Sequence, residues 1–235
     1  RPRVTAIVPA YNEQDTLAEV LLALRDTPLV DEVLVVSDGS TDDTVDIARR
    51  AGVRAIHLKE NRGKGTALAT GVAHTDSPVL IFVDADIQRL SEEMLDGLIT
   101  PVVEGRLDMN IGIRHRGAAL NAVHRHTGPL LSGIRCLRRE IFAAAPDAYL
   151  QGYRIETTLN WTCRWLGMRC GTRVLRHLKH RVKERKLGLL AGFAQRCHMF
   201  GAVFWTWARL RFAPLPLSPP QQREPRDLEL EYINF

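Results

Sequence analysis

The sequence predicts an α/β fold with a mostly parallel central sheet flanked by helices. Near-continuous apolar runs, typical of strands buried on both faces, alternate with segments whose apolar residues recur at helical spacing. Polar clusters follow several of these runs where a strand would end, and in such sheets ligands bind beyond the carboxyl ends of the strands. The predicted strands are residues 3–9, 31–36, 53–58, 78–86 and 107–114.

Helices are predicted between these strands. The first follows Asn12, which we expect to cap it. The second begins at Ser40, with Asp43 in the position of a capping-box acid. A third covers residues 65–74, and Ser91 caps a fourth. The first half of the chain therefore has a regular strand and helix alternation.

The second half has a different organisation. A strand and a short helix are expected in "GPLLSGIRCLRREIF", a helix at 152–166, a strand at 173–178 and a long helix at 187–212 rich in Phe, Trp and Arg. We therefore expect a main domain over residues 1–180, a basic amphipathic helical segment over 181–213 and an extended tail over 214–235.

Composition narrows the possible partners. The 235 residues are 45% hydrophobic, which is enough to form a large core. The net charge of +5 favours anionic partners. Aromatic residues are scarce in the basic runs before residue 200, so nucleic acid is not an expected partner. The four cysteines have no zinc-like spacing, which favours reduced thiols and a cytoplasmic location. No apolar run is long enough to span a bilayer.

The segment "FVDADIQ" carries the strongest chemical signal. Asp84 and Asp86 follow a buried strand, and Gln88 adds an amide oxygen. These are hard oxygen ligands suited to Mg²⁺ or Mn²⁺ held together with a diphosphate. The structural alternative is a pair of solvated turn aspartates.

Two further segments suit a nucleotide. Asp38 ends a strand in "SDGSTDDT", where its carboxylate can accept hydrogen bonds from a base or ribose, and Gly39 lets a ligand approach the backbone. Lys64 in "NRGKG" lies just before a helix and could bind a phosphate. Simple turn chemistry and a flexible basic loop are the respective alternatives.

In this order and spacing, "VPAYNE", "VSDGSTDDT", "NRGKGTAL" and "FVDADIQ" resemble glycosyltransferase family 2, which has the GT-A fold. The most similar subgroups are dolichol-phosphate mannose synthase-like and glucosyl-3-phosphoglycerate synthase-like enzymes. The match covers roughly residues 4–90 and continues in "LLSGIRCLRREIF", "QGYRIETTLN" and "HRVKERKLG".

The resemblance implies a role for each matching residue. The nucleoside and donor contacts are Pro9, Tyr11, Glu13, Asp38, Lys64, Asp84 and Ala85. Phosphates are neutralised by Arg135, Arg181 and Lys186. The metal ligands are Asp84 and Asp86 with Gln88, and His180 is a further candidate, in competition with His177 and His124.

The family's common "(Q/E)xxRW" motif is absent in strict form, which leaves Glu156 as the acceptor-side carboxylate. In an inverting reaction Glu156 is the expected general base, with Asp86 as the other catalytic carboxylate. A retaining reaction, or an acceptor that is already an anionic phosphate, needs no base. The basic residues from Arg135 to Arg139 then serve as an acceptor clamp.

The resemblance therefore implies a metal-dependent transfer of a hexose from a nucleotide-sugar. No motif selects the donor, and we favour a UDP-sugar over GDP-mannose. A lipid-phosphate acceptor is favoured over a small phosphorylated acid. The helix at 187–212 then lies peripherally on the inner face of a membrane, or packs on the domain or on a second copy in a homodimer. The alternatives are a non-catalytic sugar-nucleotide or lipid-binding module and a nucleotidyltransferase. A Rossmann dehydrogenase is disfavoured because the first strand lacks GxGxxG after it.

Overall fold

The computed structural model describes residues 1–115, 132–150, 154–176, 178–180, 209 and 230–233. Its strands are β1 (Val4–Ala10), β2 (Glu32–Asp38), β3 (Arg54–Leu58), β4 (Val79–Phe82), β5 (Ile87–Gln88), β6 (Met109–Arg114), β7 (Arg135–Arg138), β8 (Cys170–Leu175), β9 (Lys179–His180) and β10 (Leu230–Ile233). Its helices are α1 (Leu17–Arg25), α2 (Thr44–Arg50), α3 (Lys64–Ala73), α4 (Glu92–Val103), α6 (Arg139–Ala144) and α7 (Arg154–Trp165), with a 3-10 turn at Asp147–Tyr149.

The described strands form an eight-stranded sheet in the order β10-β3-β2-β1-β4-β7-β6-β8 and a two-stranded sheet, β5-β9. Strands β1 to β4 run parallel, whereas β7 runs antiparallel to both β4 and β6. We call the edge at which β1 to β4 end the carboxyl edge, and the opposite one the amino edge. Because β7 is reversed, its first residues lie at the carboxyl edge.

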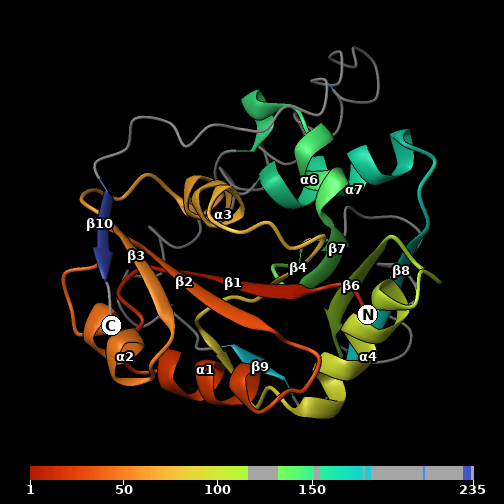
Figure 1. Cartoon of the computed structure of the whole chain (residues 1–235). Helices are drawn as coiled ribbons and strands as arrows, with labels where there is room; N and C mark the ends of the chain where they lie inside the picture. The colour runs from red at the N-terminus through yellow and green to blue at the C-terminus, as the bar shows by residue number, and fades with distance from the viewer. Residues whose placement is uncertain (116–131, 151–153, 177, 181–208, 210–229, 234–235) are drawn as a thin grey trace, which may run out of the picture.

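Helices cover both faces of the sheet (Figure 1), with α3, α6 and α7 on one side and α1, α2 and α4 on the other. In β2, Val33 and Val35 pack toward α1, whereas Leu34 and Val36 pack toward α3. Successive side chains of a strand point to opposite faces, so a strand covered on both sides requires an uninterrupted apolar run. The predicted α/β class with a mostly parallel sheet is confirmed.

Two of the predicted helix caps are wrong. Asn12 has a φ of 54° and its Oδ1 accepts a hydrogen bond from the Thr41 amide at 2.8 Å, while α1 begins only at Leu17. Ser40 Oγ accepts from the Asn12 amide at 3.1 Å, and α2 begins at Thr44. These side chains join the loops after β1 and β2 to each other, and this tertiary contact replaces the local cap. Ser91 does cap α4 through the Met94 amide.

The last described strand was not predicted. Strand β10 pairs antiparallel with β3, with Leu230 opposite Leu58, and extends the sheet at that side (Figure 1). The predicted helix at 187–212 lies outside the described residues except for Arg209, and most of the tail at 214–235 lies outside them as well.

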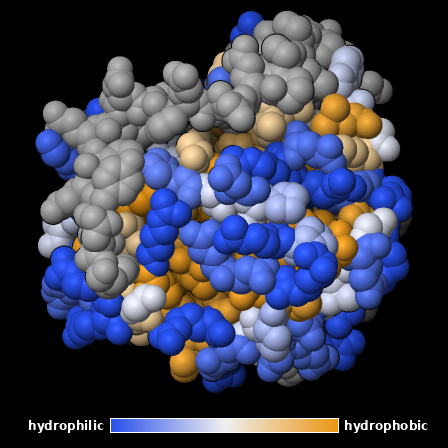
Figure 2. Space-filling model, in the orientation of Figure 1, coloured by the Kyte–Doolittle hydropathy of each residue, from blue (hydrophilic) through white to orange (hydrophobic). Residues whose placement is uncertain are grey.

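Figure 2 shows hydrophilic side chains over most of the described surface on one face, with hydrophobic ones visible between them. None of the helices in the described residues combines the length and the apolar character that crossing a lipid bilayer requires.

Candidate active site

Asp38 at the end of β2 holds the loop that precedes α3. Its Oδ1 accepts a hydrogen bond from the amide of Arg62 and its Oδ2 from the amide of Gly63, both at 2.8 Å. The residue is 4% exposed. Such a paired acceptor fixes the backbone from which the next side chain, that of Lys64, projects.

Gly39 makes this close approach of two loops possible. It has a φ of 71°, and a Cβ atom there would lie 2.6 Å from the Asn61 amide nitrogen. An L side chain is disfavoured by the conformation and excluded by the contact. Gly39 therefore allows the loop at residues 60–61 to pack closely, at the position where we predicted the approach of a ligand.

Three charged side chains from distant parts of the sequence meet at the carboxyl edge. Lys64, the first residue of α3, places Nζ 2.7 Å from Asp84 Oδ1 and 2.9 Å from Glu156 Oε1. Asp84 follows β4, and Glu156 lies in the first turn of α7. The side chains of Lys64, Asp84 and Glu156 are 28%, 22% and 10% exposed, respectively. We call them the bridged cluster.

The charges of the bridged cluster stabilise one another. Burial alone would lower the pKa of Lys64, but the carboxylates of Asp84 and Glu156 outweigh it and raise that pKa above its usual value. Burial alone would raise the pKa of Glu156, but the charges of Lys64 and Arg135 hold it below its usual value. Both groups are therefore ionised at neutral pH. Within the described residues, Glu156 Oε2 is buried without a hydrogen-bond partner.

Gly133, just before β7, packs directly against Asp84. A Cβ atom on Gly133 would lie 1.9 Å from Asp84 Oδ2, so only glycine fits without a shift of the carboxylate. No sequence pattern pointed to Gly133 itself, although it lies in the segment "LLSGIRCLRREIF" that resembles the family. The second half of the chain therefore shapes the position of a carboxylate from the first half.

Arg135 lies behind the bridged cluster. It is 1% exposed, and its guanidinium donates to the Ser132 and Glu156 carbonyl oxygens and to Asn160 Oδ1. Burial lowers its pKa, while the charge of Glu156 acts in the opposite direction. These contacts fix α7 to β7, and the predicted phosphate contact of Arg135 stays a prediction.

The predicted metal ligands lie around a short strand pair. Asp86 and Gln88 are half-buried, and Gln88 belongs to β5, which pairs antiparallel with β9. In this pairing Ile87 is opposite His180, so the backbone of His180 lies beside the residue that follows Asp86. Among the described residues, no three His, Cys, Asp or Glu side chains are grouped to hold a metal ion. The side chain of His180 is not among those described.

The other predicted contacts are distributed around the ends of β1 and β4. Pro9 is half-buried in β1, Tyr11 is 45% exposed and Ala85 is buried. Glu13 is buried, and its Oε2 accepts a hydrogen bond from Thr16 Oγ1 at 3.3 Å. Arg181 and Lys186, together with the competing His177 and His124, lie outside the described residues.

The predicted acceptor clamp from Arg135 to Arg139 is wrong for its last two arginines. Since β7 is antiparallel to β4, Arg138 pairs with Val79 at the amino edge. Arg138 forms ion pairs with Glu140 at 2.7 Å and Asp108 at 3.6 Å. Arg139 donates to the carbonyl oxygens of Thr75 and Val72. A strand of this length separates these arginines from the carboxyl edge by about 10 Å.

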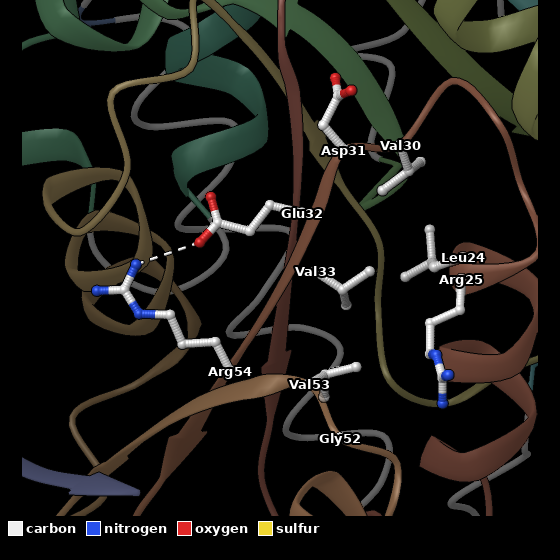
Figure 3. Close-up of a pocket in the computed structure, with 9 residues that line it drawn as sticks. All are labelled: Leu24, Arg25, Val30, Asp31, Glu32, Val33, Gly52, Val53 and Arg54. Carbon is white, nitrogen blue, oxygen red and sulfur yellow. Dashed lines mark hydrogen bonds and ion pairs between the residues drawn. The ribbon is translucent and has the colours of Figure 1, made fainter. Parts of the chain in front are cut away.

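A pocket opens at the amino edge (Figure 3), lined by the end of α1 and the starts of β2 and β3. Its charged side chains pair with one another or with the backbone: Arg54 lies 3.2 Å from Glu32, and Arg25 donates to the Ala51 carbonyl oxygen at 2.6 Å. These groups are satisfied within the protein, so the bridged cluster is the stronger candidate for chemistry.

The structure defines an α/β domain whose bridged cluster lies at the sheet edge where such folds bind ligands, and comparison with known sequences identifies its family. The model of glycosyl transferase family 2 matches residues 5–162. The chain belongs to glycosyltransferase family 2, as its motifs predicted.

Curated relatives and solved structures agree with this family. The chain is 28% identical over 207 residues to the undecaprenyl-phosphate 4-deoxy-4-formamido-L-arabinose transferase of Edwardsiella ictaluri, covering 80% of the chain and 63% of the relative. It is 28% identical over 193 residues to the glucosyl-3-phosphoglycerate synthase of Mycolicibacterium paratuberculosis, covering 66% of the chain and 58% of the relative. The chain thus spans less than two thirds of the length of these relatives.

The fold is shared with solved structures. The glucosyl-3-phosphoglycerate synthase of Mycobacterium tuberculosis, in complex with Mn²⁺, uridine-diphosphate-glucose and phosphoglyceric acid, superposes with a TM-score of 0.74 at 24% identity. The match covers 92% of this chain and 81% of that one. The predicted GT-A fold is therefore confirmed.

Proposed function

We propose that the chain is the catalytic domain of a metal-dependent glycosyltransferase that moves a hexose from a nucleotide-sugar, a UDP-sugar first, to an acceptor that carries a phosphate. One observation carries the proposal. Within a family 2 domain, the bridged cluster gathers two carboxylates and an ammonium group at the edge of the sheet where ligands bind in α/β folds.

The residues present fit a divalent cation. Asp84 and Asp86 supply hard oxygen ligands, and the pairing of β5 with β9 brings the backbone of His180 beside this pair. Gly133 leaves space for the Asp84 carboxylate that a larger residue would fill. When bound, Mg²⁺ or Mn²⁺ supplies positive charge that stabilises the developing charge on the nucleoside diphosphate leaving group. Solved relatives of this fold contain Mn²⁺ with uridine-diphosphate-glucose or Mg²⁺ with uridine-diphosphate.

Glu156 is proposed to orient the acceptor. The sequence left two cases open: a reaction in which Glu156 is a general base and one that needs no base. A general base works best when its pKa is near the working pH, whereas the pKa of Glu156 is held below its usual value. A group that stays ionised, and whose second oxygen has no partner in the described part of the chain, is suited to accept a hydrogen bond from an acceptor hydroxyl.

Two acceptor chemistries have support from the names of the relatives. One relative is named for undecaprenyl-phosphate and another for 3-phosphoglycerate, and both of these molecules carry a phosphate. We favour the lipid phosphate because of the basic, aromatic sequence at 187–212, which suits a membrane surface. In that case the protein acts peripherally at the inner face of the membrane.

Titration calorimetry tests the donor half of the proposal. UDP, GDP, UDP-glucose and GDP-mannose are titrated into wild type and Asp86→Ala, each with and without Mn²⁺. Binding of a uridine nucleotide that requires Mn²⁺ and is lost in Asp86→Ala is expected. If folded wild-type protein binds none of these nucleotides, the glycosyltransferase function is excluded.

Transfer assays then test the acceptor half. UDP-glucose is incubated with phosphoglyceric acid or with undecaprenyl phosphate in detergent, and product is followed by mass spectrometry. Transfer to the lipid alone supports the favoured acceptor, and transfer to the acid alone replaces it. Donor binding without turnover on either acceptor favours the non-catalytic binding module.

A further inference from the structure

Lys64 connects the two functional sides of the site. Its ammonium group donates to Asp84, on the side proposed for the metal and donor, and to Glu156, on the side proposed for the acceptor. An ammonium group has three donors, and these two contacts use two of them. No other lysine or arginine in the described residues is known to join both carboxylates.

The positions of Lys64 and of a cation bound by Asp84 conflict. A divalent cation held by Asp84 would bring two further positive charges close to Nζ, which lies 2.7 Å from Asp84 Oδ1. At such distances the repulsion between like charges is large, even with the screening typical of partly buried sites. The ammonium group and the cation therefore compete for the same carboxylate.

Of the three side chains of the bridged cluster, that of Lys64 is the one that can move. Asp84 lies against Gly133, whose Cα leaves no room for an added Cβ beside the carboxylate. Glu156 lies on α7, which Arg135 fixes through the Glu156 carbonyl oxygen and Asn160. Lys64, by contrast, carries its charge on a flexible four-carbon stem whose backbone is anchored one residue earlier by Asp38.

We propose that Lys64 is an internal counter-cation that occupies the bridged cluster before the donor binds, and that its ammonium group would leave Asp84 when a divalent cation is bound there. This inference rests on the proposed function. Displacement ends the link between Asp84 and Glu156, so the acceptor-side carboxylate changes its contacts only when the donor side is loaded. Glu156 Oε2, which has no hydrogen-bond partner among the described residues, is then available to an acceptor hydroxyl.

The test is the affinity for Mn²⁺ alone, measured by calorimetry and by electron paramagnetic resonance on the full chain. In Lys64→Met the competing charge is gone, so Mn²⁺ binds more tightly than to wild type, on the order of tenfold. Arg62→Met is the matched control, because it removes the same charge two positions earlier in the chain. The Arg62 side chain pairs with Glu60, so this variant is expected to bind Mn²⁺ as wild type does. The gain must disappear in Asp84→Asn/Lys64→Met.

The outcomes separate this inference from the function. If wild type binds Mn²⁺ with UDP but Lys64→Met binds Mn²⁺ alone no more tightly than wild type, the counter-cation role is overturned and the function stands. If wild type binds neither Mn²⁺ nor UDP, the function fails, and the inference fails with it. Lys64→Gln, which also removes the charge, repeats the measurement if Lys64→Met does not fold.

Discussion

The two edges of the sheet differ in how completely their charged and polar groups are paired. At the amino edge, Asp108 accepts hydrogen bonds from the amide and the Nε of Arg169, at 2.8 and 3.1 Å. The hydroxyl group of Thr5 forms hydrogen bonds with those of Thr75 and Ser77. At the carboxyl edge, one ammonium group is shared between two carboxylates, and a buried carboxylate oxygen of Glu156 has no hydrogen-bond partner among the residues that the structure describes.

This difference indicates that the charged groups of the amino edge contribute to stability and those of the carboxyl edge to function. A buried acceptor without a partner is unfavourable, typically by about 1–3 kcal/mol, so it persists where a ligand can complete it. The groups of the amino edge named above have their hydrogen-bond partners within the protein, so we expect them to contribute to the stability of the fold. Substitutions at the two edges should therefore affect different measurements.

The largest expected effect is on activity at the carboxyl edge. In Asp84→Asn the proposed cation loses a charged ligand, and kcat/KM for sugar transfer should fall by about 10²–10³-fold. Asp108→Asn, the same change at the amino edge, should leave kcat/KM close to the wild-type value. Equal losses in the two variants would remove the distinction between the edges.

A pair of glycine substitutions sharpens the comparison. In Gly133→Ala the added methyl group must displace the Asp84 carboxylate, so kcat/KM should fall by about 10²-fold. Gly105, by contrast, has no atom within 4 Å of an added Cβ but has a φ of 71°, so Gly105→Ala should lower the free energy of unfolding by about 1 kcal/mol and spare activity. A Gly133→Ala protein with normal Mn²⁺–UDP affinity and kcat/KM would contradict the close packing at Asp84.

Arg135 supports the carboxyl edge from within. Arg135→Met leaves the Ser132 and Glu156 carbonyl oxygens without this donor and should lower the free energy of unfolding by about 3 kcal/mol. Arg138→Met on the same strand removes an exposed arginine and should cost less than about 1 kcal/mol. Urea denaturation measures both, and similar losses would mean that Arg135 does not hold α7 to β7.

The smallest expected effect is a pH dependence at the amino edge. Hydrogen bonds from Arg169 hold the pKa of Asp108 below its usual value. Its contribution to stability is therefore full above the unfolded-state pKa of about 3.9 and is lost as the pH falls through the folded-state value. In thermal unfolding at pH 7, the Tm of wild type should be higher than that of Asp108→Asn by about 2–4 °C. The difference should shrink toward pH 3, and one that grows on acidification would contradict the assignment.

Local sequence patterns were sufficient for the framework of the molecule. Strand β2 was predictable because the apolar run from Val33 to Val36 has side chains buried on both faces of the sheet. The position of Asp84 follows from the end of β4. The link between Lys64 and Glu156 was not predictable, because these residues are 92 positions apart and meet only once α7 packs on the sheet. Asn12 and Ser40 have good capping side chains, but each forms a contact between loops instead.

The reversed strand β7 has a consequence for recombination between relatives. Because β7 is reversed, Gly133 just before it lies at the carboxyl edge. The site therefore combines two blocks of the chain, with Lys64 and Asp84 before the turn at Gly105 and Gly133 and Glu156 after it. A chimera joined at that turn must preserve the matches of Gly133 with Asp84 and of Lys64 with Glu156. Across family 2 we therefore expect these pairs to change together, while other parts of the two blocks diverge independently.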